Sequence, residues 1–304
     1  MVGFITEYIG QLAALGTSVL WTTTSTFFTL GGRQVGSVVL NRMRLLFAVI
    51  LLVLAHLVLR TPLPTDIGGE RLFWLSLSGI IGLVLGDALL FQAFVMIGPR
   101  LSMLMMSLSP IMAALLAWIF LGEMLSTMQL FGMLLALGGV SLVVARGNGG
   151  GVNQIDRRTY FLGLLYALGG SAGQAIGLVV AKQGLSGDFS ALSGTLVRML
   201  AAAFVMWLIT ILRRQAGETF SRMRDHPKAF RYILAGSITG PFLGVTFSLI
   251  AVQNTAVGIA STLMALPPVL LLPVGRTVFH EQIGWQAIVG TFVAIAGVAV
   301  LFLV

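Results

Sequence analysis

The sequence predicts an all-α integral membrane protein with ten transmembrane helices, arranged as two inverted five-helix repeats. Composition is the first reason, because 57% of the 304 residues are hydrophobic, 9% are charged and the mean hydropathy is +1.00. A soluble globule of this length could not bury so much apolar surface. The other two reasons are an internal repeat and the position of the charged residues between apolar runs.

The two halves of the chain repeat at a spacing of 158 residues. The first copy contains Gly82, Gly86, Ala93, Met106, Leu108, Pro110, Glu123, Gly132, Ala136 and Gly139, and the second contains Gly240, Gly244, Ala251, Met264, Leu266, Pro268, Glu281, Gly290, Ala294 and Gly297. A weak repeat within apolar segments is typical of transporters whose substrate site lies between pseudo-symmetric halves. Transport is therefore the leading hypothesis.

Apolar windows of about 20 residues predict the ten spans. They cover residues 9–30, 38–59, 73–96, 101–121, 127–145, 160–182, 190–212, 230–253, 257–279 and 283–303. Glycine, proline and charge coincide at the predicted breaks, which include residues 31–33, 60–71, 98–100 and 213–231. Residues 1–145 are predicted to form the first repeat and residues 159–304 the second. A glycine-rich linker at 146–158, which has little to bury, joins them.

The odd number of helices in each repeat means that the second copy enters the membrane in the opposite sense from the first. Fourteen Lys and Arg residues lie on odd-numbered connections and four on even-numbered ones. Because cytoplasmic loops are enriched in Lys and Arg, we expect a multi-pass protein of the inner membrane with both termini extracytoplasmic. The first ten residues contain no Lys or Arg, so they lack the basic region of a cleavable signal peptide.

Several function classes fit the sequence poorly. The net charge of +8 comes from basic residues between apolar runs, which favours a role in membrane orientation over nucleic-acid binding. The chain has no cysteine and three histidines, and His280-Glu281 does not extend to a His-Glu-x-x-His motif. We therefore expect no metal, no cofactor and no enzymatic activity, and we expect a small-molecule substrate and the lipid bilayer as partners.

Asp87 is the only acidic residue deep within a predicted span. An uncompensated carboxylate there costs at least about 2.5 kcal/mol, so Asp87 should face a partner or a wet cavity. It could bind a substrate ammonium group or take up a proton, which would couple transport to protons. It could equally hold two packed helices together through a buried hydrogen bond or ion pair. Its repeat counterpart is Val245, so the repeat does not require an acid here.

Four further charged residues occur as two pairs related by the repeat. Arg42 and Arg198 align at a local offset of 156, near the starts of the second and seventh spans. They either snorkel to the interface or pair with a substrate carboxylate or with a glutamate. Glu123 and Glu281 end the fourth and ninth spans, where each could cap the next helix or gate the contact between the halves.

Prolines and polar residues suggest where a central cavity lies. Pro110 and Pro268 are equivalent, and the second copy adds Pro267 and Pro241. Proline kinks a helix and frees carbonyl groups that a cavity can use, although a bend that only improves packing is the alternative. Further side chains that could line a cavity, or serve only structural roles, are Gln92, Gln174 and Thr239, with Trp21 and Tyr166 as stacking surfaces.

The fourth and fifth predicted spans of each half resemble a known family. Residues 107–123 (SLSPIMAALLAWIFLGE), then Gly132 and residues 136–140 (ALGGV), resemble the second part of an EamA domain, and the pattern recurs from Ala265 to Gly297. The chain thus resembles the ten-helix EamA exporters of the drug/metabolite transporter superfamily, and among them the bacterial amino-acid exporters, including those for aromatic amino acids. One departure is Phe279-His280-Glu281, where the first copy reads Leu121-Gly122-Glu123.

The resemblance implies a secondary transporter that exports small metabolites, with amino acids as the expected cargo, by alternating access. A drug or nucleotide-sugar carrier of the same superfamily is the alternative. A channel or scaffold and a membrane enzyme are the alternatives from other classes, and the enzyme would need a polar catalytic cluster that the apolar segments do not show.

Overall fold

The computed structural model describes residues 7–145, 156–187, 189–270, 272 and 284–303, and within these ranges the regular structure is helical. The first half contains α2 (Ile9–Val35), α3 (Ser37–Val58), α4 (Gly69–Gly79), η1 (Ile80–Gly86), α5 (Asp87–Met106), α6 (Ser109–Leu121) and α7 (Thr127–Ala145). The second half contains α8 (Arg157–Gly184), α9 (Ala191–Leu212), α10 (Ala216–Asp225), α11 (Pro227–Ser237), η3 (Ile238–Gly244), α12 (Val245–Asn254), α13 (Val257–Met264) and α15 (Trp285–Leu303).

The helices match the predicted all-α membrane fold. Within the described ranges, six helical stretches are long and apolar enough to cross a membrane, and three shorter apolar helices accompany them. Helix α2 is outside that set because it is rich in threonine and serine. The hydroxyl groups of Thr17, Thr22 and Thr24 donate to carbonyl oxygens four residues earlier, which satisfies them inside the helix.

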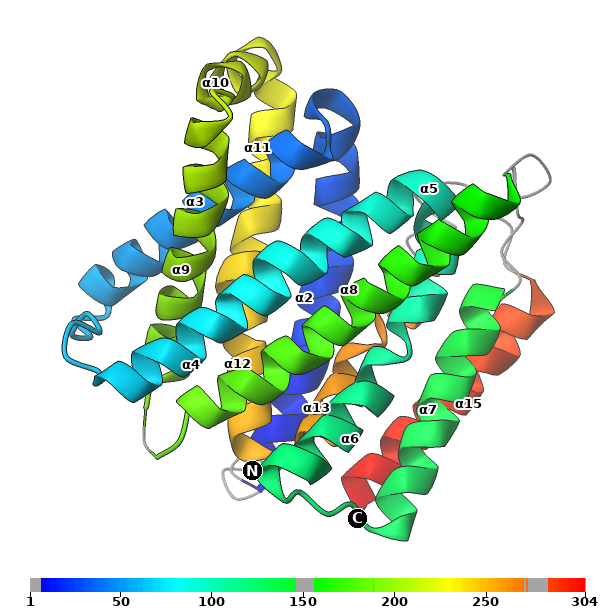
Figure 1. Cartoon of the computed structure of the whole chain (residues 1–304). Coiled ribbons are helices and arrows are strands. Elements are labelled where there is room, and N and C mark those ends of the chain that lie inside the picture. Colours follow the sequence, from blue (N-terminus) through cyan, green and yellow to red (C-terminus); the bar gives the residue numbers. More distant parts are fainter. Residues whose placement is uncertain (1–6, 146–155, 188, 271, 273–283, 304) are drawn as a thin grey trace.

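Two long helical rods cross the centre of the molecule. Segments α4, η1 and α5 run on from one another and lie along α8, while α11, η3 and α12 form the equivalent rod of the second half and pack against α2 (Figure 1). Helices α7 and α15 pack together at one side of the bundle. Each rod therefore contacts the first helix of the opposite half, so the two halves interlock.

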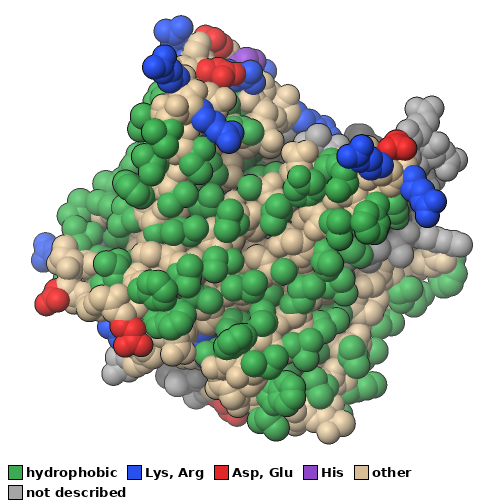
Figure 2. Space-filling view, in the orientation of Figure 1, with side chains coloured by type: hydrophobic (Ala, Val, Ile, Leu, Met, Phe, Trp, Pro, Cys, Tyr) green, Lys and Arg blue, Asp and Glu red, His purple; other side chains and the backbone are tan. Residues whose placement is uncertain are grey.

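The two ends of the bundle differ in charge. The start of α2 and the end of α15 lie at the same end (Figure 1), where the Tyr8 and Phe302 rings stack with centroids 5.7 Å apart. Basic side chains gather at the opposite end, at the α10 corner and the start of α8, while the face between is largely hydrophobic (Figure 2). A hydrophobic face between charged ends is the surface that a lipid bilayer requires.

Three predicted breaks differ from the structure. Residues 31–33 lie inside α2, which continues to Val35. Helix α5 continues through residues 98–100, where a break was predicted. A proline removes only one backbone N–H donor from the helix, and membrane helices tolerate this loss. The equivalent region of the second half does break, at Thr255, whose backbone is extended. The polar stretch at 213–231 is also more ordered than a plain connection, because it contains helix α10 and the start of α11.

Helices α2 and α3 are joined by a single residue, Gly36. Its φ of +85° lies in the left-handed region, which residues with a Cβ rarely adopt. The chain thereby reverses direction without a loop.

Candidate functional site

Two π-helical segments lie at the centre of the two long rods. Segments η1 and η3 are related by the repeat spacing of 158 residues at both their first and last positions. Pro241 lies inside η3, but the corresponding residue in η1 is Leu83, so proline is not the common cause. Both segments share the repeated glycines that the sequence analysis identified. Because π-helical turns occur often at functional sites, these segments are the natural place to look for one.

The glycines of η1 allow a very close approach to α8. A Cβ placed on Gly173 would lie 2.7 Å from the Cα of Gly86, and one placed on Gly177 would lie 3.0 Å from the Cα of Gly82. Any side chain here would push the two halves apart. The recurrent four-residue glycine spacing therefore serves close helix contact.

In the second half, the glycines of η3 face side chains of α2. A Cβ on Gly240 would meet the Thr24 side chain at 2.5 Å, and one on Gly244 would meet the Trp21 indole nitrogen at 2.8 Å. The hydroxyl groups of Thr24 and Thr239 are 2.8 Å apart and hydrogen-bonded. Two predicted site residues, Trp21 and Thr239, are thus brought to the contact between the halves.

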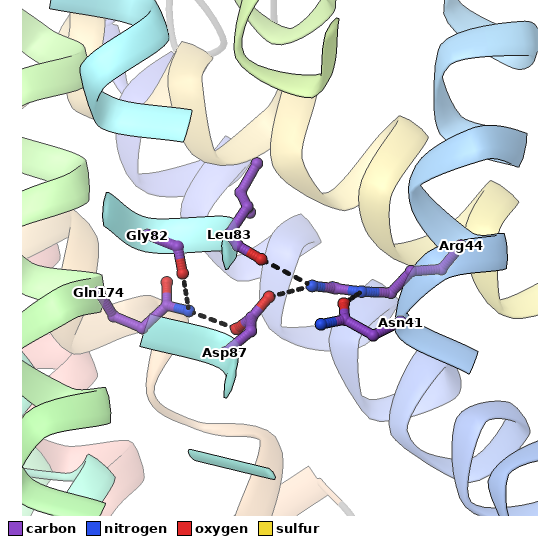
Figure 3. Close-up of polar contacts among 6 residues, drawn as sticks. All are labelled: Asn41, Arg44, Gly82, Leu83, Asp87 and Gln174. Atoms are coloured by element: carbon purple, nitrogen blue, oxygen red, sulfur yellow. Dashed lines mark hydrogen bonds and ion pairs between the residues drawn. The ribbon is translucent and has the colours of Figure 1, made fainter. Parts of the chain in front are cut away.

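Asp87 follows η1 directly and is the acidic centre of the site. Its Oδ2 atom forms an ion pair with Arg44 of α3, and its Oδ1 atom accepts a hydrogen bond of 2.7 Å from the Gln174 amide of α8 (Figure 3). Gln174 also donates to the Gly82 carbonyl oxygen over 3.4 Å. The structure therefore brings together Asp87 and Gln174, both predicted site residues, and joins the two halves through them.

Arg44 is held in place by several groups. Its Nε donates to the Asn41 Oδ1 over 2.7 Å, and its Nη2 donates to the Leu83 carbonyl oxygen of η1 over 3.3 Å (Figure 3). Its guanidinium carbon lies 5.6 Å from the centroid of the Phe91 ring. Arg44 is the compensating cation that a buried Asp87 requires. Arg44 was not a predicted site residue, because its position in the sequence is that of a basic residue on a connection between spans.

Counted from the helix starts, Arg44 of α3 is equivalent to Arg198 of α9, whereas local sequence identity aligns Arg42 with Arg198. Helices α3 and α9 each have 22 residues, and Arg44 and Arg198 are the eighth residue of their helices. Arg198 is only 3% exposed. Within the described ranges, its Nε and Nη1 atoms have no hydrogen-bond partner. Because only 3% of Arg198 is exposed, its side chain does not snorkel to an interface.

Arg42 has a different environment, at the end of the molecule that carries α10. It is buried, and its guanidinium donates to Gln215 and, over 2.9 Å, to the Thr219 hydroxyl of α10. Arg42 therefore ties α10 to α3. It does not pair with Glu123, whose partner is Lys182.

Glu123 contacts two residues of the other half, through its two carboxylate oxygens. One carboxylate oxygen lies 2.6 Å from Lys182 Nζ of α8, and the other accepts a 2.7 Å hydrogen bond from the Val257 N–H at the start of α13. Lys182 also donates to the Thr255 carbonyl oxygen over 2.8 Å. Glu123 thus caps a helix of the other half rather than the next helix of its own. Glu281 lies outside the described residues.

The predicted proline kinks are mostly helix starts. Pro110 stands in the first turn of α6, just after the turn at residues 107–108. Pro267 and Pro268 begin a short helical stretch after the equivalent break at residues 265–266. A proline in the first turn removes an N–H that has no helical partner, so it marks the break at little cost. Pro241 alone lies inside a helical segment, η3.

Two predicted site residues lie apart from the buried cluster. Gln92 of α5 and Tyr166 of α8 are both exposed. Within the described residues, no group of three or more His, Cys, Asp or Glu side chains could hold a metal ion.

A family model for EamA-like transporters matches the chain twice, over residues 8–145 and 161–303. The chain belongs to the EamA-like transporter family. The predicted resemblance is thus confirmed for the family, in the drug/metabolite transporter superfamily, and the protein is a multi-pass membrane protein of a transporter family.

This EamA-like protein also resembles a solved crystal structure. The match has a TM-score of 0.74 and covers 97% of this chain and 96% of the other. At 19% sequence identity, it shows a shared fold alone. No curated protein sequence matches the chain at a significant level.

Proposed function

We propose that this EamA-like protein is a secondary transporter that exports small organic metabolites, with amino acids as its cargo, by alternating access. The observation that carries the proposal is the pair of π-helical segments, one repeat apart, each packed on the first helix of the opposite half. Inverted repeats with irregular helices at their interface are the architecture that places a substrate site near the membrane midplane.

The contacts at the centre support a moving interface. Glycine pairs such as Gly86 and Gly173 let backbones approach without interlocking side chains, so one rod can shift along its neighbour. The same region holds a carboxylate, an amide and two arginines, all from helices that meet between the halves. A buried site with both signs of charge suits a zwitterionic cargo such as an amino acid.

The contact among Glu123, Lys182 and Val257 supports a gate at the end that carries the termini. It joins the connection after α6 of the first half to α8 and α13 of the second through charged hydrogen bonds. Such a contact can break and re-form as a unit, which a gate between two access states requires. In the orientation that we propose, this end faces away from the cytoplasm.

Counterflow in proteoliposomes tests the proposal. Liposomes that contain the purified protein are loaded with a mixture of unlabelled amino acids, and each labelled amino acid is then added outside. An alternating-access carrier accumulates the label transiently, because unlabelled cargo leaves as labelled cargo enters. We expect accumulation for at least one amino acid.

Protein-free liposomes give the background, and repeating the assay with a pH gradient reports proton coupling. A channel would equilibrate the label without overshoot, which would contradict the carrier mechanism. Exchange of nucleotide sugars or drugs but of no amino acid would contradict the cargo class while supporting transport.

A further inference from the structure

Arg198 is a buried cation whose hydrogen-bonding capacity is largely unused. A guanidinium group carries five N–H donors, and burying it without acceptors is costly. Arg198 is 3% exposed, and its Nε and Nη1 atoms have no partner among the described residues. A buried, unsatisfied polar group of this kind calls for an explanation, and an absent ligand is one.

Comparison with the first half of the chain shows that Arg198 lacks a carboxylate partner. Its counterpart Arg44 pairs with Asp87, and the residue at the position of Asp87 in the second half is Val245. Val245 packs in the same buried cluster as Leu196 and Met199, the neighbours of Arg198 on α9. The second half therefore has the arginine but not the carboxylate.

The charges of the central cluster do not balance. Arg44, Arg198 and Asp87 are all buried, so the three together carry one net positive charge. Asp87 interacts electrostatically with Arg198 as well, but its two oxygen atoms are already bonded to Arg44 and Gln174. One further anion would make the site neutral.

Arg198 also lies at the right place for a ligand. Its Nη2 atom is 3.6 Å from the point where a Cβ on Gly82 would lie, so the guanidinium is beside η1. Gly82 is the residue whose carbonyl oxygen accepts a hydrogen bond from Gln174. Arg198 is thus beside η1, the segment that directly precedes Asp87, and at the contact between the halves.

We infer that Arg198 is the anion-binding residue of the transport site, and that the substrate presents a carboxylate to it. This inference rests on the proposed transport function. The planar guanidinium fork matches a carboxylate in geometry and can bind both of its oxygens. A bound carboxylate would take the role that Asp87 has in the first half and that no acid fills in the second half. It would also neutralise the net positive charge of the site for the conformational change.

Paired ligands that differ only in the carboxylate test the inference. Phenylalanine is compared with phenylalanine amide, and benzoate with benzamide, by the rise in thermal unfolding temperature of the purified protein in detergent. This readout needs no transport. We expect the carboxylate of each pair to bind roughly tenfold to a hundredfold more tightly, the range for one hydrogen bond to a charged group.

Variants of the protein test whether Arg198 causes the preference for carboxylates over amides. Arg198→Gln should remove the preference, and Arg198→Lys, which keeps the charge but not the fork, should retain part of it. The control is Arg71→Gln, because Arg71 already donates to the Ser186 carbonyl oxygen over 2.9 Å and should not affect the preference. Val245→Asp should give Arg198 a partner within the protein and so abolish carboxylate binding.

The outcomes separate this inference from the proposed function. Equal binding of carboxylates and amides by the wild-type protein, or an unchanged preference in folded Arg198→Gln, would overturn the inference even if amino acids exchange in proteoliposomes. A carboxylate preference that depends on Arg198, without exchange of any amino acid, would support the inference and reject amino acids as cargo. Should Val245→Asp not fold, the two Arg198 variants decide.

Discussion

At the scale of single residues, the Asp87–Arg44 ion pair predicts how substitutions at Asp87 and Arg44 affect stability and transport. Replacing Asp87 by Asn keeps the shape but leaves Arg44 as a buried charge without a counter-ion, and removing one partner of a buried pair costs about 3–5 kcal/mol. We expect Asp87→Asn to lower the unfolding temperature in detergent and to impair counterflow. Because the double variant Arg44→Gln/Asp87→Asn removes both charges, it should recover part of the stability.

A double-mutant cycle measures this coupling. The matched control is Asp66→Asn, since Asp66 is exposed on the connection between α3 and α4. It should leave stability and counterflow unchanged. Additive effects of the two single changes, with normal transport and pH profile in Asp87→Asn, would show that the pair neither stabilises the fold nor serves transport.

Part of this site could be predicted from sequence and part could not. Asp87 is visible because a carboxylate within an apolar span is costly wherever its partner lies. Arg44 could not be predicted as a site residue, because an arginine near the start of a predicted span is usually interfacial. The sequence does not show how deeply the residue is buried. Local identity aligns Arg42 with Arg198, while the helix starts align Arg44 with Arg198, and the helix starts are known only from the structure.

At the scale of helices, two adjacent glycines of α7 differ sharply in their surroundings. A Cβ on Gly139 would lie 2.3 Å from the Ala294 backbone nitrogen of α15, whereas a Cβ on Gly138 would meet nothing within 4 Å. We therefore expect Gly139→Ala to separate α7 from α15 and to lower the thermal unfolding temperature. Gly138→Ala serves as its control and should be neutral or slightly stabilising, by up to about 1 kcal/mol, because alanine favours helix.

The same comparison tests the packing of α7 on α15 directly. Similar unfolding temperatures for both variants would mean that the two helices do not pack through Gly139. Crosslinking of cysteines at Gly132 and Val300, whose side-chain Cγ1 lies 3.0 Å from a Cβ on Gly132, gives a second measure.

Hydropathy predicts which segments are helical better than where each helix ends. Apolar composition located the spans because a membrane requires it. It did not predict that α5 would pass through residues 98–100, because a proline there is compatible with both a break and a continuous helix. The π-helical segments were not predicted either, although Gly82, Gly86 and their repeats marked their positions.

The orientation of the whole molecule is predicted by its basic residues. The segment from the end of α9 to the start of α11 lies at the end opposite the start of α2 and carries Arg213, Arg214, Arg222, Arg224, Lys228 and Arg231. Because basic loops stay in the cytoplasm, we expect both termini to be extracytoplasmic. Alkaline phosphatase fused to the C-terminus should be active, while a fluorescent reporter that folds only in the cytoplasm should be dark. The reverse pattern would contradict this orientation.

The two halves are not packed identically, although they share one architecture. Helix α9 packs against α12, while the equivalent helices α3 and α5 contact each other through Arg44, which reaches Asp87 and Phe91. At the end that carries the termini, Glu123 and Lys182 join the halves. In the alternating-access mechanism that we propose, such an asymmetry corresponds to one access state, and exchanging the two packings gives the other.

This exchange predicts opposite behaviour at two equivalent positions. Leu108 and Leu266 occupy the breaks before Pro110 and Pro268, one repeat apart. The chain contains no cysteine, so Leu108→Cys and Leu266→Cys introduce single reactive sites. When cargo shifts the protein between its states, membrane-impermeant thiol labelling from one side should rise at one position and fall at the other.

Thr65→Cys, on the exposed connection between α3 and α4, controls for access of the reagent and should label equally in both states. The physical reason for the opposite response is that the two-fold relation exchanges the environments of Leu108 and Leu266 whenever the halves exchange conformations. If labelling rises or falls together at both positions, the halves move in concert toward one side, and alternating access by exchange between inverted repeats is wrong for this protein.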